Sequence, residues 1–304
     1  MPEVIEVLKY ADFLRTKLKG KKITDINILN GRYKTHGPPE NLDNLIKALP
    51  LKVKSIETKG KFLYMHFENG MYLFSTLGLS GGWAWTKDEE AGDDKIQFGH
   101  LLKYIAKDKL DQYHAKALKH LNVEFITTDG TLYFYDVLSY GTLKVVLTEA
   151  ELNKKLSSIG PDITAETTTY DVFKARLDKA GAEKLIGNVL MNQRLISGIG
   201  NYLRADVLWL AKISPHRQMK DISPADVKKI WTFSRMLAWA KYNYKKGVKD
   251  GYIEKDHPKT PEDYKREFYV YYQNSDPQGH AVTKEEMYEG SQKRFIYWVP
   301  SVQH

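Results

Sequence analysis

The sequence predicts an α+β protein in which a β-rich first half is followed by a helical second half and a terminal β-hairpin. Runs of β-branched and aromatic residues fill the first half, whereas hydrophobic residues at helical spacing dominate from position 149 onward. Asn-Gly at 69–70 and Asp-Gly at 129–130 are typical of tight turns between strands. We therefore expect two domains, with a boundary between Thr148 and Ser158.

The chain opens with an expected helix that ends at Gly20. Its hydrophobic positions at helical spacing are Val4, Leu8, Ala11 and Leu18. Pro2 at the helix start, followed by Glu3 and by Glu6 on the same face, is an ordinary helix-start pattern. Taken alone, these three residues need no role beyond starting the helix.

Four runs predict strands in the first half. They are Ile23–Leu29, Val53–Thr58, Phe62–Phe67 and Met71–Thr76. The segment Asp88–Lys119 fits this pattern poorly, because an acidic run is followed by a lysine-rich helical pattern. We interpret it as a solvated insertion, with contact to a partner as the alternative.

Four runs predict helices in the second half. They are Glu149–Leu156, Tyr170–Lys179, Lys184–Gln193 and Ala225–Lys245. At the end of the chain, the pattern predicts a hairpin: Phe268–Tyr272 as one strand, Asp276–Gly279 as a turn, and Arg294–Trp298 as the returning strand.

Composition favours a polyanionic partner. The formal net charge is +8, and 20 Tyr with 6 Trp offer surfaces for base stacking, although many basic proteins share these values. The 304 residues contain no cysteine, which excludes a disulfide framework and a cysteine zinc site. No apolar run is long enough to span a membrane and no signal peptide is recognisable, so we expect an intracellular protein.

The most informative stretch is 191–208, where two helical patterns meet at a turn containing Gly198 and Gly200. Asn201 stands where the second helix would begin. Backbone amides, the positive end of the helix dipole and a side-chain amide would therefore converge on a site suited to an anion. The alternative is a simple helix hairpin, closed by glycines and capped by Asn201.

The amino-acid sequence of this stretch resembles the helix–two-turn–helix element of the formamidopyrimidine-DNA glycosylase and endonuclease VIII family. The resemblance implies that Asn201 binds DNA phosphate. It also implies a fold with an N-terminal helix, a β-sandwich, a helix–two-turn–helix domain and a β-hairpin finger. The implied domains are residues 1–150, 151–263 and 264–304.

The N-terminus extends the resemblance, since this family uses an N-terminal proline, freed of the initiator methionine, as its nucleophile. An α-amine has a pKa of about 8, against about 10.4 for lysine, so a free Pro2 is the readier nucleophile at neutral pH. The family opens Pro-Glu-Gly-Pro-Glu, whereas this chain reads Pro2, Glu3, Val4, Ile5, Glu6. The resemblance implies catalytic roles for Pro2, Glu3 and Glu6, and the two β-branched residues change the bulk beside them.

Further matches concern single positions. Lys61, in Thr-Lys-Gly-Lys-Phe-Leu, corresponds to the family's second catalytic lysine, or is a solvated lysine on a strand. Leu79, in Leu-Gly-Leu-Ser-Gly, corresponds to the residue that fills the hole left by a flipped base, or is simply packed. Residues 136–141 correspond to the family's Asp-x-Arg-x-Phe-Gly segment, with Tyr140 in place of the aromatic wedge and Leu138 in place of the arginine. The alternative is that Leu138 belongs to the core and that another loop, for example one within 88–119, supplies the cation.

The terminal hairpin resembles the finger that lacks zinc in the endonuclease VIII-like branch, including giant-virus members, with Arg294 as its phosphate-binding residue or as a solvated edge arginine. The resemblance implies a DNA glycosylase with associated lyase activity that excises oxidised bases. We expect double-stranded or single-stranded damaged DNA as partner, no metal, no cofactor and a monomer located at the DNA, whether in nucleus, cytoplasm or viral factory. The rival is a non-catalytic relative that binds damaged or distorted DNA.

Overall fold

The computed structural model describes residues 2–87, 97–99, 119–244, 268–289 and 292–304. The chain divides into two compact units, residues 1–157 and 158–304, which are treated separately below. Met1, whose removal the proposed nucleophile requires, lies outside the described residues. Most of the predicted insertion at 88–119 also lies outside them, except for 97–99 and 119.

Unit 1 consists of a long first helix, α1 (Val4–Leu18), and an antiparallel sheet. The other elements, in chain order, are β1 (Lys22–Ile28), α2 (Arg32–Thr35), α3 (Leu42–Lys47), β2 (Leu51–Lys59), β3 (Phe62–Phe67), β4 (Tyr72–Thr76), β5 (Gly81–Thr86), β6 (Gln97–Phe98), β7 (Leu121–Thr127), β8 (Gly130–Asp136), β9 (Thr142–Val146) and α5 (Glu149–Ser157). The predicted first helix and the four predicted strands are all present, with bounds that differ by at most a few residues.

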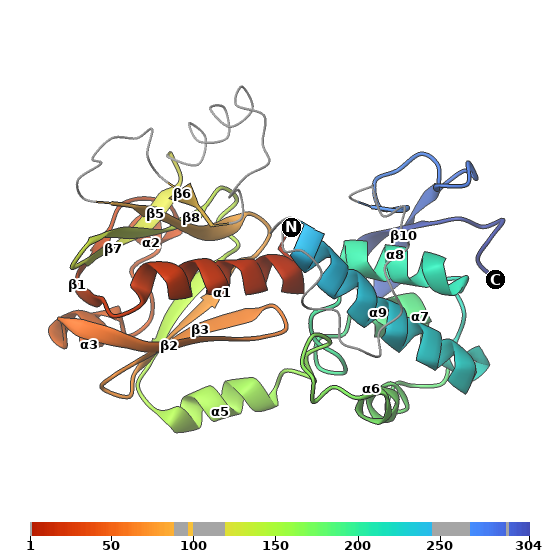
Figure 1. The fold of residues 1–304 in the computed structure, drawn as a ribbon, viewed down its shortest axis with the longest axis horizontal. Coiled ribbons are helices and arrows are strands. Elements are labelled where there is room, and N and C mark those ends of the chain that lie inside the picture. The colour runs from red at the N-terminus through yellow and green to blue at the C-terminus, as the bar shows by residue number, and fades with distance from the viewer. Residues whose placement is uncertain (1, 88–96, 100–118, 245–267, 290–291) are drawn as a thin grey trace. The chain divides into compact units, whose positions relative to one another are not determined.

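The sheet has the strand order β6-β5-β8-β7-β1-β2-β3-β4-β9. Among the described residues, its two halves, β6-β5-β8-β7-β1 and β2-β3-β4-β9, join where β1 pairs with β2. Lys22 pairs with Lys52, and Ile23 with Leu51. In Figure 1 the halves lie above and below α1, which contacts β2, β3 and β5. The buried face of α1, with Leu14 and Tyr10 at its centre, therefore fills the core between the two halves.

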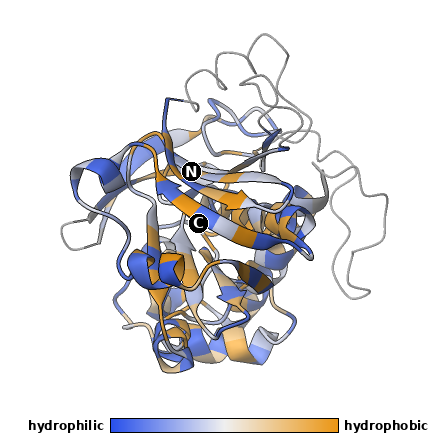
Figure 2. Cartoon of the chain, turned by 90° about the vertical axis from the view of Figure 1, so that its left-hand side faces the viewer, coloured by the Kyte–Doolittle hydropathy of each residue, from blue (hydrophilic) through white to orange (hydrophobic). Residues whose placement is uncertain are grey.

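The strands form where the sequence alternates. In β3, buried residues alternate with half-buried ones over most of its length, and hydrophobic and hydrophilic residues alternate along the ribbons in Figure 2. The Asn69-Gly70 turn that follows has Gly70 at a φ of +85°, a conformation that glycine adopts without steric cost. Local pattern and turn chemistry thus agree on the β3–β4 hairpin.

Unit 2 is mainly helical and ends in a two-stranded hairpin. Its elements are α6 (Tyr170–Leu177), α7 (Ile186–Val189), α8 (Asn201–Ala211), η3 (Met219–Asp221), α9 (Pro224–Tyr244), β10 (Thr283–Glu289) and β11 (Gln292–Trp298). α8 contacts both α9 and β11, and nearly all of its side chains are buried, including the charged Arg204 and Asp206. The predicted α+β architecture, with an N-terminal helix, a large sheet, a helical region and a terminal hairpin, is confirmed.

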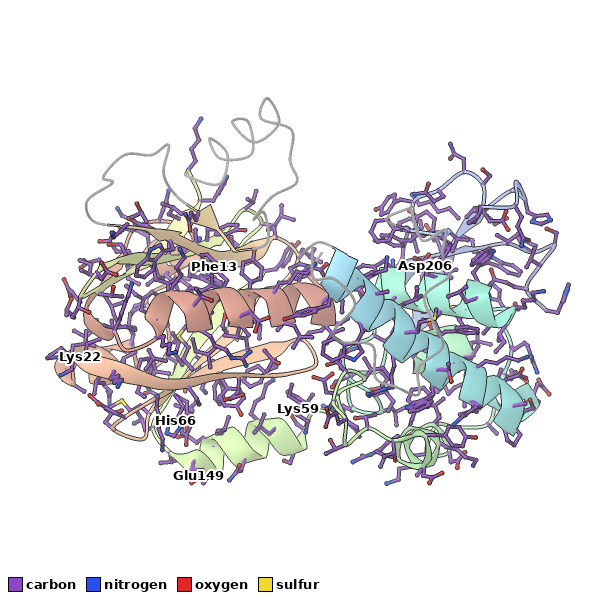
Figure 3. The ribbon with its side chains drawn as sticks, viewed as in Figure 1. Phe13, Lys22, Lys59, His66, Glu149 and Asp206 are labelled. Carbon is purple, nitrogen blue, oxygen red and sulfur yellow. The ribbon has the colours of Figure 1, made fainter. Side chains whose placement is uncertain are left out.

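The strand predicted at Phe268–Tyr272 is wrong, because β11 pairs with β10 instead. Asp206 on α8, labelled in Figure 3, accepts hydrogen bonds from the backbone amides of Val270 and Tyr271 at 3.0 and 3.3 Å. Tyr272 then adopts a φ of +55°. The amides that a neighbouring strand would use are therefore committed to a buried carboxylate.

The predicted turn at Asp276–Gly279 is present and is organised by one buried side chain. Asp276 accepts hydrogen bonds from the amides of Gln278 and His280, both at 2.9 Å, and from the indole of Trp209 at 3.1 Å. Burial would raise the pKa of Asp276, but hydrogen bonds from the His280 side chain and from these donors lower it below its usual value. This carboxylate therefore ties the turn to α8.

Candidate functional site

The start of α1 concentrates carboxylates. Glu3 is fully buried, while Pro2 before it is half-buried. Glu3 and Glu6 form a capping box, in which each side chain accepts a hydrogen bond from the other residue's backbone amide; the Glu3 amide lies 2.9 Å from Glu6 Oε2. A buried carboxylate is costly unless hydrogen-bonded, so this reciprocal pairing stabilises the buried side chain of Glu3 at the start of α1.

Lys61 lies in the turn between β2 and β3 and is half-buried, so the prediction that a strand carries it is wrong by one position. Arg15 donates to the Ile56 carbonyl at 2.8 Å, which fixes α1 against β2. From this contact the helix runs about 18 Å back to Glu3, and the strand runs about 16 Å forward to Lys61. Figure 1 shows the β2–β3 turn at the same end of unit 1 as the N-terminal end of α1.

The neighbouring Lys59 makes a contact that joins two elements of unit 1. Its ammonium donates to the carbonyl of Leu156 at 2.7 Å and so ties β2 to α5. Figure 3 shows Lys59 where these two elements meet. Lys59, at the end of β2, and Lys61, in the turn that follows, therefore provide a matched pair for experiments.

Two loops of unit 1, residues 77–81 and 136–141, are held together and are called the wedge loops here. Asp136 is buried and accepts hydrogen bonds from Ser80 Oγ and from the amides of Leu138 and Gly141. A Cβ atom at Gly78 would lie 2.6 Å from the Tyr140 carbonyl carbon and 2.6 Å from the Gly141 nitrogen. Only glycine allows the two backbones to approach this closely.

The wedge loops expose three large apolar side chains. Leu79 is 43% exposed, Leu138 54% and Tyr140 63%. The alternative in which Leu138 belongs to the core is therefore wrong. Exposed apolar residues that gather on two rigidly joined loops are suited to contact with an apolar partner surface, such as a nucleobase face.

A cation does lie beside the wedge loops. Arg32 of α2 is half-buried, and its guanidinium is 3.5 Å from the Ser139 carbonyl oxygen and 3.4 Å from that of Gly141. These contacts are at the long end of hydrogen bonding. Arg32 therefore supports the backbone of the loop that carries Leu138 and Tyr140.

In unit 2, the glycine turn before α8 is shaped by a side chain. Gln193 donates to the Ile199 carbonyl at 2.8 Å and accepts from the Gly198 amide at 3.0 Å. Gly198 has a φ of +105°, as a glycine turn requires. The N-cap of α8 is Gly200, which makes no side-chain cap, and Asn201 is the first helical residue, so the interpretation of Asn201 as the cap is wrong.

The Asn201 side chain is instead bonded to a buried arginine that sequence reasoning missed. Arg204, one turn along α8, donates to Asn201 Oδ1 and, at 3.0 Å, to the carbonyl of Phe295. Arg294 precedes Phe295 on β11 and is exposed. One guanidinium thus joins Asn201 to the strand that carries Arg294. The i, i+3 spacing of Asn201 and Arg204 in a mainly apolar helix is the signal that could have identified it.

Apart from Lys61 in the β2–β3 turn, the predicted residues fall into three local groups. The α1 start holds Pro2, Glu3 and Glu6, the wedge loops hold Leu79, Leu138 and Tyr140, and unit 2 holds Asn201 and Arg294. The first group suits proton transfer and the last suits anion binding. Within the described residues, no group of three or more His, Asp or Glu side chains is arranged to hold a metal ion. Nor does any described helix have the length and apolarity to cross a membrane.

Three family models match the chain in succession. The formamidopyrimidine-DNA glycosylase N-terminal domain matches residues 1–143, the H2TH domain of the same enzymes matches residues 159–240, and their C-terminal domain matches residues 259–304. Together they account for most of the sequence.

Relatives of known name agree with this match. A formamidopyrimidine-DNA glycosylase of Ligilactobacillus salivarius is 27% identical over 230 residues, which cover 75% of this chain and 72% of the relative. An endonuclease 8 of Salmonella arizonae is 28% identical over 230 residues, covering 75% and 74%.

Solved structures of Lactococcus lactis Fpg share the fold. The complex of a mutant with DNA containing Fapy-dG has a TM-score of 0.73 and 23% identity, with 100% of both chains covered. The complex with DNA containing an abasic site has a TM-score of 0.73 and 22% identity over the same coverage.

Proposed function

This chain belongs to the formamidopyrimidine-DNA glycosylase and endonuclease VIII family, and from that premise we propose that it excises oxidised bases and then cleaves the strand as an abasic-site lyase. The single observation that supports this most strongly is the start of α1, where the fully buried Glu3 follows Pro2 and is paired with Glu6. A carboxylate buried beside an N-terminal secondary amine is the combination that this chemistry needs.

The proposed mechanism starts when the lesion is extruded from the duplex. The Pro2 nitrogen, freed by loss of Met1, attacks C1′ of the sugar as the C1′–base bond breaks. The proton that the Pro2 nitrogen loses balances the proton with which the base leaves. Glu3 supplies a proton to the sugar ring oxygen as the ring opens. The resulting iminium draws electrons from the C2′–H bond, that proton is lost, and the C3′–O bond breaks to release the 3′ phosphate.

The remaining predicted residues would bind DNA. Glu6, Lys61, Asn201 and Arg294 are assigned to positioning the DNA backbone. Leu79, Leu138 and Tyr140 are assigned to the space that the extruded base leaves, which agrees with their exposure. The substrate class that family membership supports is damaged DNA, and we extend it to oxidised pyrimidines and ring-opened purines, acted on by a monomer without metal.

Borohydride trapping tests the nucleophile directly. Protein shown by mass spectrometry to lack Met1 is incubated with abasic-site DNA and borohydride, which reduces the iminium to a stable covalent adduct. We expect the wild type to trap and the adduct to map to Pro2. Lys61→Ala should still trap, and so should Lys59→Ala, which serves as the matched structural control.

Two results would overturn the assignment. One is an adduct on protein that retains Met1, because its Pro2 nitrogen is an amide and is not nucleophilic. The other is trapping by Pro2→Gly, which keeps a primary α-amine, together with no trapping by Lys61→Ala. That pair of results would make Lys61 the nucleophile.

The rival function is a relative that binds damaged DNA without reacting with it. The observation in its favour is that Val4 and Ile5, which stand where the family has Gly and Pro, are both buried next to the proposed nucleophile. The same trapping experiment separates the two functions. A processed protein that binds abasic-site DNA but forms no adduct would support the rival.

A further inference from the structure

Arg204 is a fully buried arginine that joins α8 to three other elements of unit 2. Its Nη2 donates to Asn201 Oδ1 on α8 and to the Phe295 carbonyl on β11, the latter at 3.0 Å. Its Nη1 donates to the Gly187 carbonyl on α7 at 3.0 Å and lies 3.7 Å from Met287 Sδ on β10. A buried guanidinium is costly unless well bonded, and both terminal nitrogens of this one have acceptors.

The chemistry of Arg204 settles which way the Asn201 amide faces. A guanidinium has five N–H donors and no acceptor, so the atom of Asn201 that it contacts must be the carbonyl oxygen. The NH2 group of Asn201 then points away from Arg204. Asparagine is otherwise free to exchange its oxygen and nitrogen by a 180° flip about the last bond.

The same guanidinium also fixes β11 beside Arg294. Register pairs Arg294 with Met287, so these two side chains project from the same face of the hairpin. Met287 is buried on that face against Arg204. The bond from Arg204 to the Phe295 carbonyl therefore holds the backbone next to Arg294 in place relative to Asn201.

We propose that Arg204 is a positioning residue of the phosphate site: it locks the Asn201 amide with its NH2 group toward the DNA phosphate and fixes the strand that carries Arg294. This inference rests on the proposed function, because it assumes that Asn201 and Arg294 bind phosphate. Arg204 itself makes no phosphate contact, since it is fully buried.

The main test is a double-mutant cycle on DNA affinity. Binding to a duplex with a tetrahydrofuran abasic analogue is measured for wild type, Arg204→Lys, Asn201→Ala and the double variant. A lysine keeps the charge but not the planar fork that reaches both acceptors. We expect Arg204→Lys to weaken binding about tenfold, the worth of one charge-assisted hydrogen bond, with an unchanged salt slope. Asn201→Ala should then cost little more in the Arg204→Lys background.

Arg235 provides the matched control. It is also a buried arginine of unit 2, and its Nη1 donates to the carbonyls of Ile163 and Ala165 at 2.9 and 2.7 Å. Arg235→Lys should lower the melting temperature as Arg204→Lys does but leave DNA affinity within about twofold of wild type. Additive losses in the cycle, or equal losses of affinity in the two lysine variants, would overturn the proposal and leave Arg204 a structural residue.

A second variant tests the amide orientation without disturbing the buried arginine. Asn201→Asp keeps an oxygen for Arg204 but turns the outward donor into an anionic acceptor. We expect it to melt no lower than wild type and to bind DNA more weakly than Asn201→Ala, because the carboxylate repels phosphate. Affinity equal to or above that of Asn201→Ala would refute the locked orientation. If wild type itself fails to bind the abasic duplex, the proposed function fails instead, and the two failures are thereby distinguished.

Discussion

Helices α1 and α8 lie in different units and begin with opposite chemistry. α1 begins with Glu3 and Glu6, whose carboxylates cap the helix, whereas the N-cap of α8 is Gly200, which has no side chain to do so. No acidic residue lies in the first turn of α8, which contains the amide of Asn201 and the buried guanidinium of Arg204. The start of α1 thus carries hydrogen-bond acceptors, whereas the start of α8 carries hydrogen-bond donors.

The difference shows how a helix N-terminus can serve either to hold the protein's own carboxylates or to bind an anionic ligand. Every helix start carries partial positive charge, which stabilises an anion placed there. In α1 the anions belong to the protein, so the field helps to hold carboxylates where proton transfer is proposed. The first turn of α8 contains no acidic residue, so we expect the same field to favour an anionic ligand such as phosphate. The predictions below test this division between the two units.

The largest expected effect concerns Glu3. If its carboxylate takes part in proton transfer, Glu3→Gln should reduce single-turnover base excision by about 10²- to 10⁴-fold. Cleavage of DNA that already carries an abasic site should fall less, because the base has already left. Comparing the two rates on matched oligonucleotides measures both steps.

Two other carboxylates of α1 provide controls. Glu6→Gln keeps an acceptor for the Glu3 amide, as a capping box allows, so its loss of excision should be smaller than that of Glu3→Gln. Asp12 lies further along α1 and bonds to Arg15, and Asp12→Asn should leave excision unchanged. Retention of excision within tenfold by Glu3→Gln would show that these carboxylates only cap the helix.

Elements with a strong local pattern could be predicted from the sequence. The helix at Val4–Leu18 and the strand at Phe62–Phe67 were predictable because hydrophobic period and turn residues are local signals. The helix predicted at Lys184–Gln193 shortens to Ile186–Val189. Its last predicted residue, Gln193, turns its side chain toward Gly198 and Ile199 to shape the turn, which periodicity does not encode.

Long-range contacts were not predictable. The strand expected at Phe268–Tyr272 does not form because Asp206, more than sixty residues earlier, accepts two of its amides. Buried charges in α8 organise distant segments in both cases, Asp206 for this turn and Arg204 for Asn201 and β11. A sequence shows that such a helix contains two charged residues but not which backbone groups they bind.

A smaller effect, on DNA affinity, is expected from the proposed phosphate-binding residues of unit 2. Arg294→Ala removes a cation, so DNA affinity should fall by about tenfold for unrelated sequences alike, and the salt slope should decrease by about one unit. Asn201→Ala removes a neutral donor, so affinity should fall while the slope stays nearly constant. Titrations at four salt concentrations measure both quantities.

Lys284 offers a control for Arg294, because it is exposed on β10 of the same hairpin. Register pairs it with Tyr297, and its ammonium lies 4.4 Å from the Phe295 ring centroid, which places it on the face opposite Arg294. Lys284→Ala should change the slope less than Arg294→Ala. Unchanged DNA affinity and salt slope in Arg294→Ala, or strict dependence of DNA binding on added zinc, would contradict a metal-free phosphate site formed by Asn201 and Arg294.

The smallest expected effect belongs to Leu138, which tests whether unit 1 reads the base opposite the lesion. Leu138 is 54% exposed and apolar where the family has an arginine that hydrogen-bonds this base. A guanidinium discriminates between bases by about 1–3 kcal/mol, whereas leucine contacts every base about equally. Single-turnover rates on one lesion opposite each of the four bases should therefore differ by less than about tenfold, or about 1.4 kcal/mol.

Leu138→Arg should widen that spread in favour of one opposite base, whereas Leu138→Met, which stays apolar, should not. Leucine makes no hydrogen bond to the orphaned base, so less binding free energy offsets the cost of opening an intact duplex. The wild type should therefore prefer lesions in bubbles or single strands, where unstacking costs less. Leu138→Arg should reduce that preference. A wild-type spread above tenfold would mean that another cation reads the opposite base; Arg32, which already contacts the carbonyls of Ser139 and Gly141, is then the first residue to replace.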